Sequence, residues 1–210
     1  MQPPTQIPTA ENDSLSHKLE QVGKILRLIG WVGIVTQLGL AIAAGLLLLF
    51  AIAGRNFNQA AGSLAIPGAP ANSFSATTPG LGIGIFWAVC GILALFFTAF
   101  LAFRQLLFAR RLRHPNLERH PKKSDVMQVL RIGIIAGFVG MALAILGGGA
   151  SLGVLLAKSI AQPQGVAIYD PTRIIRPLDV FVAMANMIAI TAHFLGTIAS
   201  VATVNWLHRQ

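Results

Sequence analysis

Charged residues are scarce in this chain of 210 residues, at only 11% of the total. Soluble globular domains carry about 25% charged residues, so a water-exposed surface of the ordinary kind is excluded. Hydrophobic residues make up 54% of the chain, and its mean hydropathy is +0.68. The composition therefore indicates an integral membrane protein.

The sequence has one cysteine and no recognisable targeting signal or lipid-anchor motif. A single cysteine, Cys90, excludes a disulfide within the chain, and its apolar neighbours favour a packing role. The early acidic residues Glu11, Asp13 and Glu20 argue against a cleaved leader or an organelle transit peptide. We therefore expect an uncleaved chain held in the membrane by its own apolar segments.

The sequence has no motif that commonly carries catalysis. It lacks a phosphate-binding Gly-rich loop, a nucleophile elbow, a dinucleotide fingerprint and paired catalytic carboxylates. We therefore expect no enzyme activity and no resident cofactor. The basic segment 104–131 lacks the interleaved aromatic residues of a single-strand binder, so we expect no nucleic-acid partner either.

Long charge-free runs define the fold class. A helix needs about 20 predominantly apolar residues to cross the hydrocarbon core of a bilayer. Four runs qualify, and they predict an all-α polytopic membrane domain over residues 28–207, with spans at about 28–54, 81–103, 132–157 and 178–207. The segment between the second and third spans, 104–131, is predicted to be a basic cytoplasmic loop.

The basic residues are divided unequally between the two sides of these spans. Three of the 16 precede residue 28, eight lie in 104–131 and one follows 207, which leaves four for the other side. Because Lys and Arg concentrate in cytoplasmic loops, both termini are predicted to be cytoplasmic or stromal. The same charges are expected to contact anionic lipids of the inner leaflet.

The N-terminal segment has two parts. Residues 1–13 are polar and Pro-rich, which predicts a disordered tail. In 14–27, apolar residues recur every three or four positions, which indicates an amphipathic helix. This helix is expected either to lie on the inner leaflet as an interfacial helix or to pack on the inner side of the protein itself.

Small residues recur at helical spacing in the third and fourth spans. In membranes, such residues let helix backbones approach closely. They predict a tight bundle or a homo-oligomer interface, with a conduction path lined by glycine backbone as the alternative. The predicted packing positions are Gly133, Ala136, Gly137, Gly140, Ala144, Gly148, Gly149, Gly153 and Gly196.

Polar residues recur every seven positions along the fourth span: Asp179, Asn186, His193 and Ser200. Seven residues are nearly two helical turns, so the four share one face. An ionisable residue inside a membrane is a functional candidate by default, so the stripe is a candidate transport path. The structural interpretation is that His193 and Asn186 bond to neighbouring helices while Asp179, third in a helix that begins at Pro177, stabilises its start.

A metal-handling role is a weaker hypothesis for the same stripe. His193 and Asp179 offer nitrogen and oxygen ligands suited to Fe, Mn or Zn. No compact ligand cluster occurs in the chain, so only transient binding of iron or another divalent cation is expected.

The C-terminal third resembles a known family. The resemblance is sharp over about 169–200, and its residues are Asp170-Pro171, Arg176, Leu178-Asp179-Val180-Phe181, Ala185-Asn186 and Ala192-His193-Phe194. They are similar to a cyanobacterial and plastid family of unknown function that includes the smaller translocon component of the chloroplast inner envelope, also described as an iron permease. The resemblance implies a four-helix protein of a cyanobacterial inner or thylakoid membrane, or of the plastid inner envelope in plants, with no catalytic residues.

Two functions follow as expectations. The first is a permease for iron or another divalent cation, with the helix-four stripe as its path. The alternative is a non-enzymatic subunit or assembly factor of a membrane complex for protein translocation or membrane biogenesis. Because four helices enclose little space, a homo-oligomer or a complex with partner subunits is expected to be the working unit.

Overall fold

The computed structural model describes residues 9–63, 81–112, 121–161 and 175–209, without the side chains of 9–19, 55–63 and 81. Four α-helices account for nearly all of these residues: α1 (Thr9–Ser63), α2 (Leu81–Leu112), α3 (Lys123–Ala161) and α4 (Pro177–His208). Each is long and apolar enough to cross a membrane. The predicted all-α class with four candidate spans is therefore confirmed.

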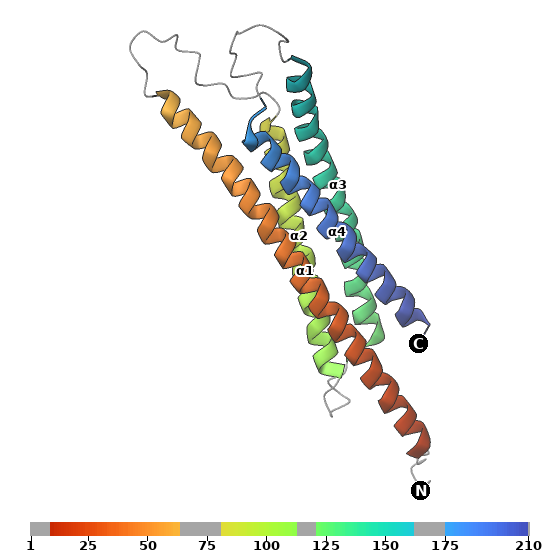
Figure 1. The fold of residues 1–210 in the computed structure, drawn as a ribbon. Helices are drawn as coiled ribbons and strands as arrows, with labels where there is room; N and C mark the ends of the chain where they lie inside the picture. The colour runs from red at the N-terminus through yellow and green to blue at the C-terminus, as the bar shows by residue number, and fades with distance from the viewer. Residues whose placement is uncertain (1–8, 64–80, 113–120, 162–174, 210) are drawn as a thin grey trace, which may run out of the picture.

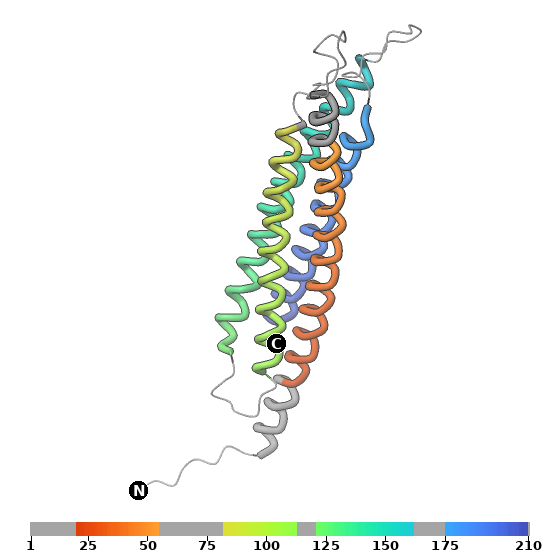
Figure 2. Tube along the Cα trace, turned by 90° about the vertical axis from the view of Figure 1, so that its left-hand side faces the viewer, coloured from red at the N-terminus to blue at the C-terminus, as the bar shows by residue number. Residues whose placement is uncertain are grey.

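The helices run alternately up and down in one elongated bundle (Figures 1 and 2). Each helix packs along the next, and α4 closes the ring by packing on α1, while α2 and α4 also meet across the bundle. The start of α1 and the end of α4 lie at the same end of the bundle as the end of α2 and the start of α3 (Figure 1). We call this end the basic end, because Lys24, Arg110 and Lys123 lie there, and the other the opposite end.

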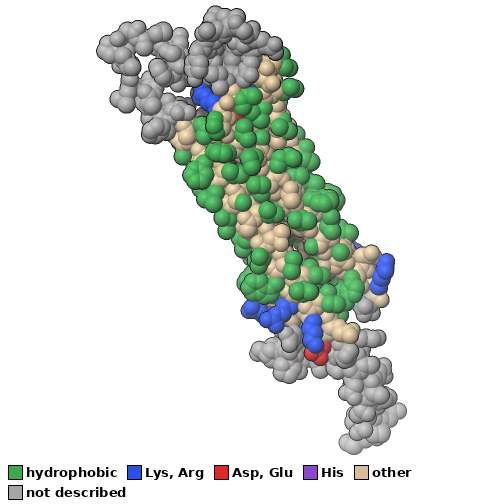
Figure 3. Space-filling model, viewed as in Figure 1, with side chains coloured by type: hydrophobic (Ala, Val, Ile, Leu, Met, Phe, Trp, Pro, Cys, Tyr) green, Lys and Arg blue, Asp and Glu red, His purple; other side chains and the backbone are tan. Residues whose placement is uncertain are grey.

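The bundle has large apolar side chains outside and small ones inside. Leu49, Phe100 and Ile135 are more than half exposed, whereas Ala44 and Ala192 are fully buried. Figure 3 shows apolar side chains over the whole length of the bundle, with Lys and Arg side chains gathered at its lower end and also present at its upper end. Such a surface suits lipid, where large side chains meet acyl chains and small ones let the helices approach.

The helices extend beyond the predicted spans at the basic end. α2 continues to Leu112 and α3 begins at Lys123, so most of the predicted loop 104–131 is helical. The reason is an apolar core in this region, in which Phe108 and Ala109 of α2 pack against Val126 and Leu130 of α3. The charges there mark the expected membrane boundary and not the ends of the helices.

The first helix is continuous from Thr9, so 9–13 is helical where a tail was predicted and 14–27 is not a separate helix. Residues 1–8 of the predicted tail lie outside the described residues. No proline interrupts α1, and its glycines are isolated, so nothing in the sequence forces a break. Leu26 is 1% exposed and packs in the core cluster that contains Phe108 and Leu207. At Leu26 the apolar face of the segment therefore packs on the protein itself, which was the alternative interpretation.

Candidate functional site

The polar stripe of α4 lies against a glycine stripe of α3. Ser200 faces Gly133, His193 faces Gly140 and Asn186 faces Gly147, so each step of seven on α4 matches a step of seven on α3. The two helices are antiparallel, which keeps this register along their contact. We call this contact the polar seam; its α4 members are Asp179, Asn186, His193, Thr197 and Ser200.

His193 is buried in the polar seam and is only 1% exposed. Its Nε2 lies 3.1 Å from the carbonyl oxygen of Gly91 on α2. Since a carbonyl only accepts, Nε2 carries the proton and Nδ1 of the neutral ring is an acceptor. Nδ1 has no hydrogen-bond partner among the described residues. The ring fits because position 140 is glycine: an added Cβ there would collide with it.

Asn186 lies two turns from His193 towards the opposite end, and it too has one polar atom with a hydrogen-bond partner and one without a partner among the described residues. Its Nδ2 donates to the carbonyl of Val182 at 2.9 Å, one turn back on α4. Its Oδ1 is buried without a partner within the described part of the chain and faces Gly147, beside Trp87 of α2. Asn186 Oδ1 is therefore an acceptor free to bind a ligand at the point where α2, α3 and α4 meet.

Asp179 begins the seam at the opposite end, and there it forms a buried ion pair with Lys158 of α3. The two side chains are 2% and 5% exposed. The Arg176 backbone N–H also donates to Asp179 Oδ2 at 3.1 Å. As predicted, Pro177 is the first helical residue and Asp179 the third, so the carboxylate both caps α4 and ties it to α3.

A small polar cavity lies beside His193, with a volume of about 20 Å³. That is room for about one water molecule. Gln37, 5% exposed, reaches it from α1, and its Oε1 also lacks a partner among the described side chains. The other polar lining residues are Thr98, Gln105, Thr197 and Ser200.

Sequence reasoning did not identify Lys158, Gln37 or Gln105 as members of this site. Gln37 and Gln105 are amides within or beside long apolar runs, and that isolation was the available signal. From the sequence alone, Lys158 was only one of the four basic residues on the side away from the cytoplasm. Its partner lies 21 residues away on another helix, so the pair depends on how α3 packs against α4.

The structure does not bring the two proposed metal ligands together. Asp179 and His193 are 14 residues apart, which is about 21 Å along α4. Within the described ranges, no group of three or more His, Cys, Asp and Glu side chains is close enough to hold a metal ion. Met184 and Met187 are about half exposed on the outside of the bundle. The seam therefore offers ligand atoms one after another and not as a cage.

The predicted packing positions fall into two groups. Most of them lie between helices, with Ala144 against Gly91 and Gly196 against the side chain of Gln37. Gly149 and Gly153 are exposed instead, and no described atom lies within 4 Å of a Cβ added at either one. Gly147 is the residue that contacts the seam in this part of α3. Gly149 and Gly153 face outward, where lipid or another helix can contact them.

Four antiparallel apolar helices around a buried polar seam define an integral membrane protein of the four-helix type. Over residues 16–208 the chain matches the family described as "Protein of unknown function (DUF3611)", and it belongs to that family. It is 29% identical over 204 residues to "Protein TIC 21, chloroplastic" of Arabidopsis thaliana. The relationship predicted from the C-terminal third is thereby confirmed.

The alignment covers 93% of this chain and 60% of the Arabidopsis protein, so the chain spans well under two thirds of its relative's length. No solved structure matches the chain.

Proposed function

We propose that this chain is a permease for a small cation, iron or another divalent metal ion, in a cyanobacterial or plastid-type membrane. One observation carries the proposal: Gln37 Oε1, Asn186 Oδ1 and His193 Nδ1 are buried without partners among the described residues. All three are acceptors, the kind of atom that replaces water around a cation. An unsatisfied polar atom inside a bilayer costs several kcal/mol, so three such acceptors favour a site that takes up a water molecule or an ion.

The orientation of the permease follows from charge. Lys24, Arg110, Arg111 and Arg209 lie on segments that end or begin at the basic end of the bundle. By the positive-inside tendency, we place this end on the cytoplasmic or stromal side. The continuation of α1 before residue 28 then reaches the headgroup region of that leaflet, where an amphipathic segment is stable.

We interpret the structure as a closed state of such a path. The cavity beside His193 has room for only about one water molecule, and Asn186 lies seven residues, about 10 Å, nearer the start of α4. An ion would pass from the first acceptor to the next as α3 and α4 separate slightly at their glycine contacts. Sequential weak sites suit transport, because an ion held by a full cage is released slowly.

Metal flux through reconstituted protein tests this function. Liposomes with a trapped dye quenched by Fe²⁺ or Mn²⁺ would report uptake by the wild-type chain and by His193→Ala. We expect at least a tenfold loss of flux, because the substitution removes the central acceptor of the seam. Met187→Leu is the matched control, since Met187 is 55% exposed on the same helix, and its flux should equal that of the wild type.

Thermal unfolding in detergent would confirm that both variants are folded. Full flux through His193→Ala, or no flux through the wild type, would contradict the permease.

A second candidate function is a subunit of a membrane complex for protein translocation or membrane biogenesis. The observation that favours it is the exposed pair Gly149 and Gly153 on α3, flanked by the exposed Leu152 and Leu156. Small residues on an outward face let a helix of another subunit, or of a second copy, approach closely. Absence of flux together with co-purifying membrane proteins would favour this alternative.

A further inference from the structure

An apolar groove runs along the outside of the bundle between α1 and α4, with a volume of about 380 Å³. Leu28, Val32 and Thr36 form its α1 wall, and Leu195, Ala199 and Ala202 form its α4 wall. Gly33 and Gly196 also line the groove, and at its inner end Gly196 packs against the side chain of Gln37. The groove opens sideways, because Leu28 and Val32 are more than half exposed.

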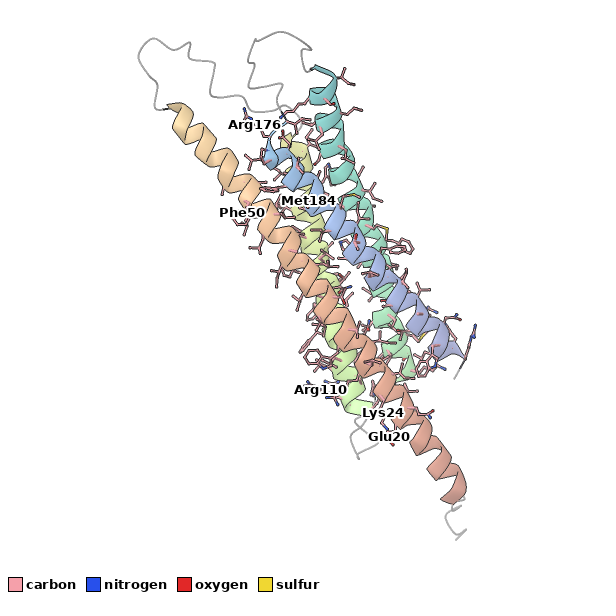
Figure 4. All side chains as sticks on the ribbon, in the orientation of Figure 1. Glu20, Lys24, Phe50, Arg110, Arg176 and Met184 are labelled. Carbon is pink, nitrogen blue, oxygen red and sulfur yellow. The ribbon has the colours of Figure 1, made fainter. Side chains whose placement is uncertain are left out.

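Two cations continue the groove walls towards the basic end. Lys24 lies one turn before Leu28 on the stripe of Val32 and Thr36, and Arg209 lies seven residues after Ala202 on the stripe of Leu195. Both cations are exposed, and Figure 4 labels Lys24 at this end of α1. Lys24 also pairs with Glu20 at 2.9 Å, a solvent-exposed pair that holds it only weakly.

Both helices take part in the buried core at the basic end. Leu26 of α1 and Leu207 of α4 belong to the same buried core cluster. Lys24 and Arg209 continue the two walls of the groove towards the basic end, on the stripes of Leu28 and Leu195. An anion at this end of the groove would be attracted by both.

The length of the groove matches one leaflet of a bilayer. From Leu28 to Gln37 the helix rises about 14 Å, and half of the hydrocarbon core is about 15 Å. We therefore propose that the groove binds one anionic membrane lipid, with an acyl chain along the groove and its headgroup between Lys24 and Arg209. This site is independent of the proposed permease function.

Charge argues for a lipid and against a second copy of the chain in this groove. A symmetric dimer across the groove would bring Lys24 and Arg209 of one chain near the same cations of the other, and such like-charge contacts are unfavourable. An anionic lipid neutralises them instead. The groove also shares Gly33, Gln37 and Gly196 with the polar cavity, so the bound chain would separate that cavity from the bilayer.

Native mass spectrometry of the full chain in detergent tests the headgroup site. The protein would be mixed with equal amounts of phosphatidylglycerol and phosphatidylcholine that carry the same acyl chains. We expect the wild type to retain one phosphatidylglycerol molecule. Lys24→Gln with Arg209→Gln should lower this preference about 30-fold, from the usual attraction of two basic residues to an anionic surface.

The matched control removes the same charge elsewhere at the basic end. Arg110→Gln with Arg111→Gln changes two exposed cations of the last turn of α2, which does not line the groove. It should retain the preference of the wild type. An equal loss in both double variants would show only general surface attraction and would overturn the site.

A groove-filling variant tests the acyl-chain part. Ala202→Phe keeps both cations but occupies the groove, so both lipids should be lost, whereas Ala53→Phe, at an exposed position outside the groove, should retain them. Soluble glycerol phosphate should not displace the lipid if the acyl chain is needed. Unchanged retention by Ala202→Phe would overturn the proposal, as would a wild-type dimer that Ala202→Phe converts to a monomer.

Discussion

The fourth helix has two very different contacts, one with α3 and one with α1. Towards α3, polar side chains face glycines at every second turn, and an ion pair closes the opposite end. Towards α1, Gly196 packs against the side chain of Gln37, but the neighbouring residues leave a groove of about 380 Å³. The difference shows that a glycine closes a helix contact only where the facing side chain fills the space that it leaves.

The comparison also indicates where stability resides. Inside a bilayer, lipid is as apolar as the helices, so close packing and buried polar contacts hold the bundle together. The polar seam has close packing and buried polar contacts, whereas few side-chain contacts are made across the groove. Substitutions in the seam should therefore destabilise the protein more than substitutions in the groove walls.

The largest effect should come from breaking the buried ion pair. Asp179→Asn leaves Lys158 buried, charged and without its partner, which typically costs about 3–5 kcal/mol. Thermal or denaturant unfolding in detergent would measure the loss. Adding Lys158→Met to Asp179→Asn should recover most of it, because an apolar side chain needs no partner.

The exposed pair Glu20 and Lys24 is the control for this prediction. Glu20→Gln breaks a pair whose side chains are 54% and 61% exposed, so it should change the free energy of unfolding by no more than about 1 kcal/mol. Equal effects of Asp179→Asn and Glu20→Gln would mean that the pair does not fasten α3 to α4.

A smaller effect is expected from a single methyl group in the seam. Gly140→Ala places a Cβ against the ring of His193, and overpacking of this kind costs about 1–3 kcal/mol. Gly149→Ala adds the same methyl group on the same helix with no described atom within 4 Å. The control should be neutral or slightly stabilising by helix propensity, and the two melting temperatures should therefore move in opposite directions or differ clearly.

If both glycine variants melted alike, the fit of His193 into α3 would not depend on the missing side chain. Retained stability of Gly140→Ala would then indicate that the ring moves aside easily.

The sequence supports prediction of the fold better than prediction of the helix contacts. Four charge-free runs give four spans, and the seven-residue spacing from Asp179 to Ser200 gives one face of α4. Periodicity does not identify the facing residue on another helix, because that depends on how far α3 slides along α4. For this reason Gly147, which faces Asn186, was not among the predicted packing positions.

The ends of the helices depend on signals other than charge, because charge marks the membrane boundary and not the end of a helix. α2 and α3 continue past that boundary because apolar residues such as Leu130 are buried between the helices there. Lys158 shows the reverse difficulty, since a charge near the end of a span was assigned to solvent although it is 5% exposed.

The smallest change in stability is expected at Gln37, where the seam and the groove meet. Its Oε1 is buried without a partner among the described residues, so Gln37→Met removes an unsatisfied atom while nearly keeping the volume. The free energy of unfolding should stay within about 1 kcal/mol of the wild type or increase. Metal flux in liposomes should nevertheless fall, because an acceptor beside His193 is lost.

Thr36→Val is the matched control, since Thr36 precedes Gln37 and lines the groove but not the polar cavity. It should change neither stability nor flux. A large loss of stability in Gln37→Met would mean that the amide supports the bundle and that its bare oxygen has no separate role. Lower flux at unchanged stability would show that this oxygen is kept for transport, because packing alone gives no reason to retain an unsatisfied acceptor inside a membrane.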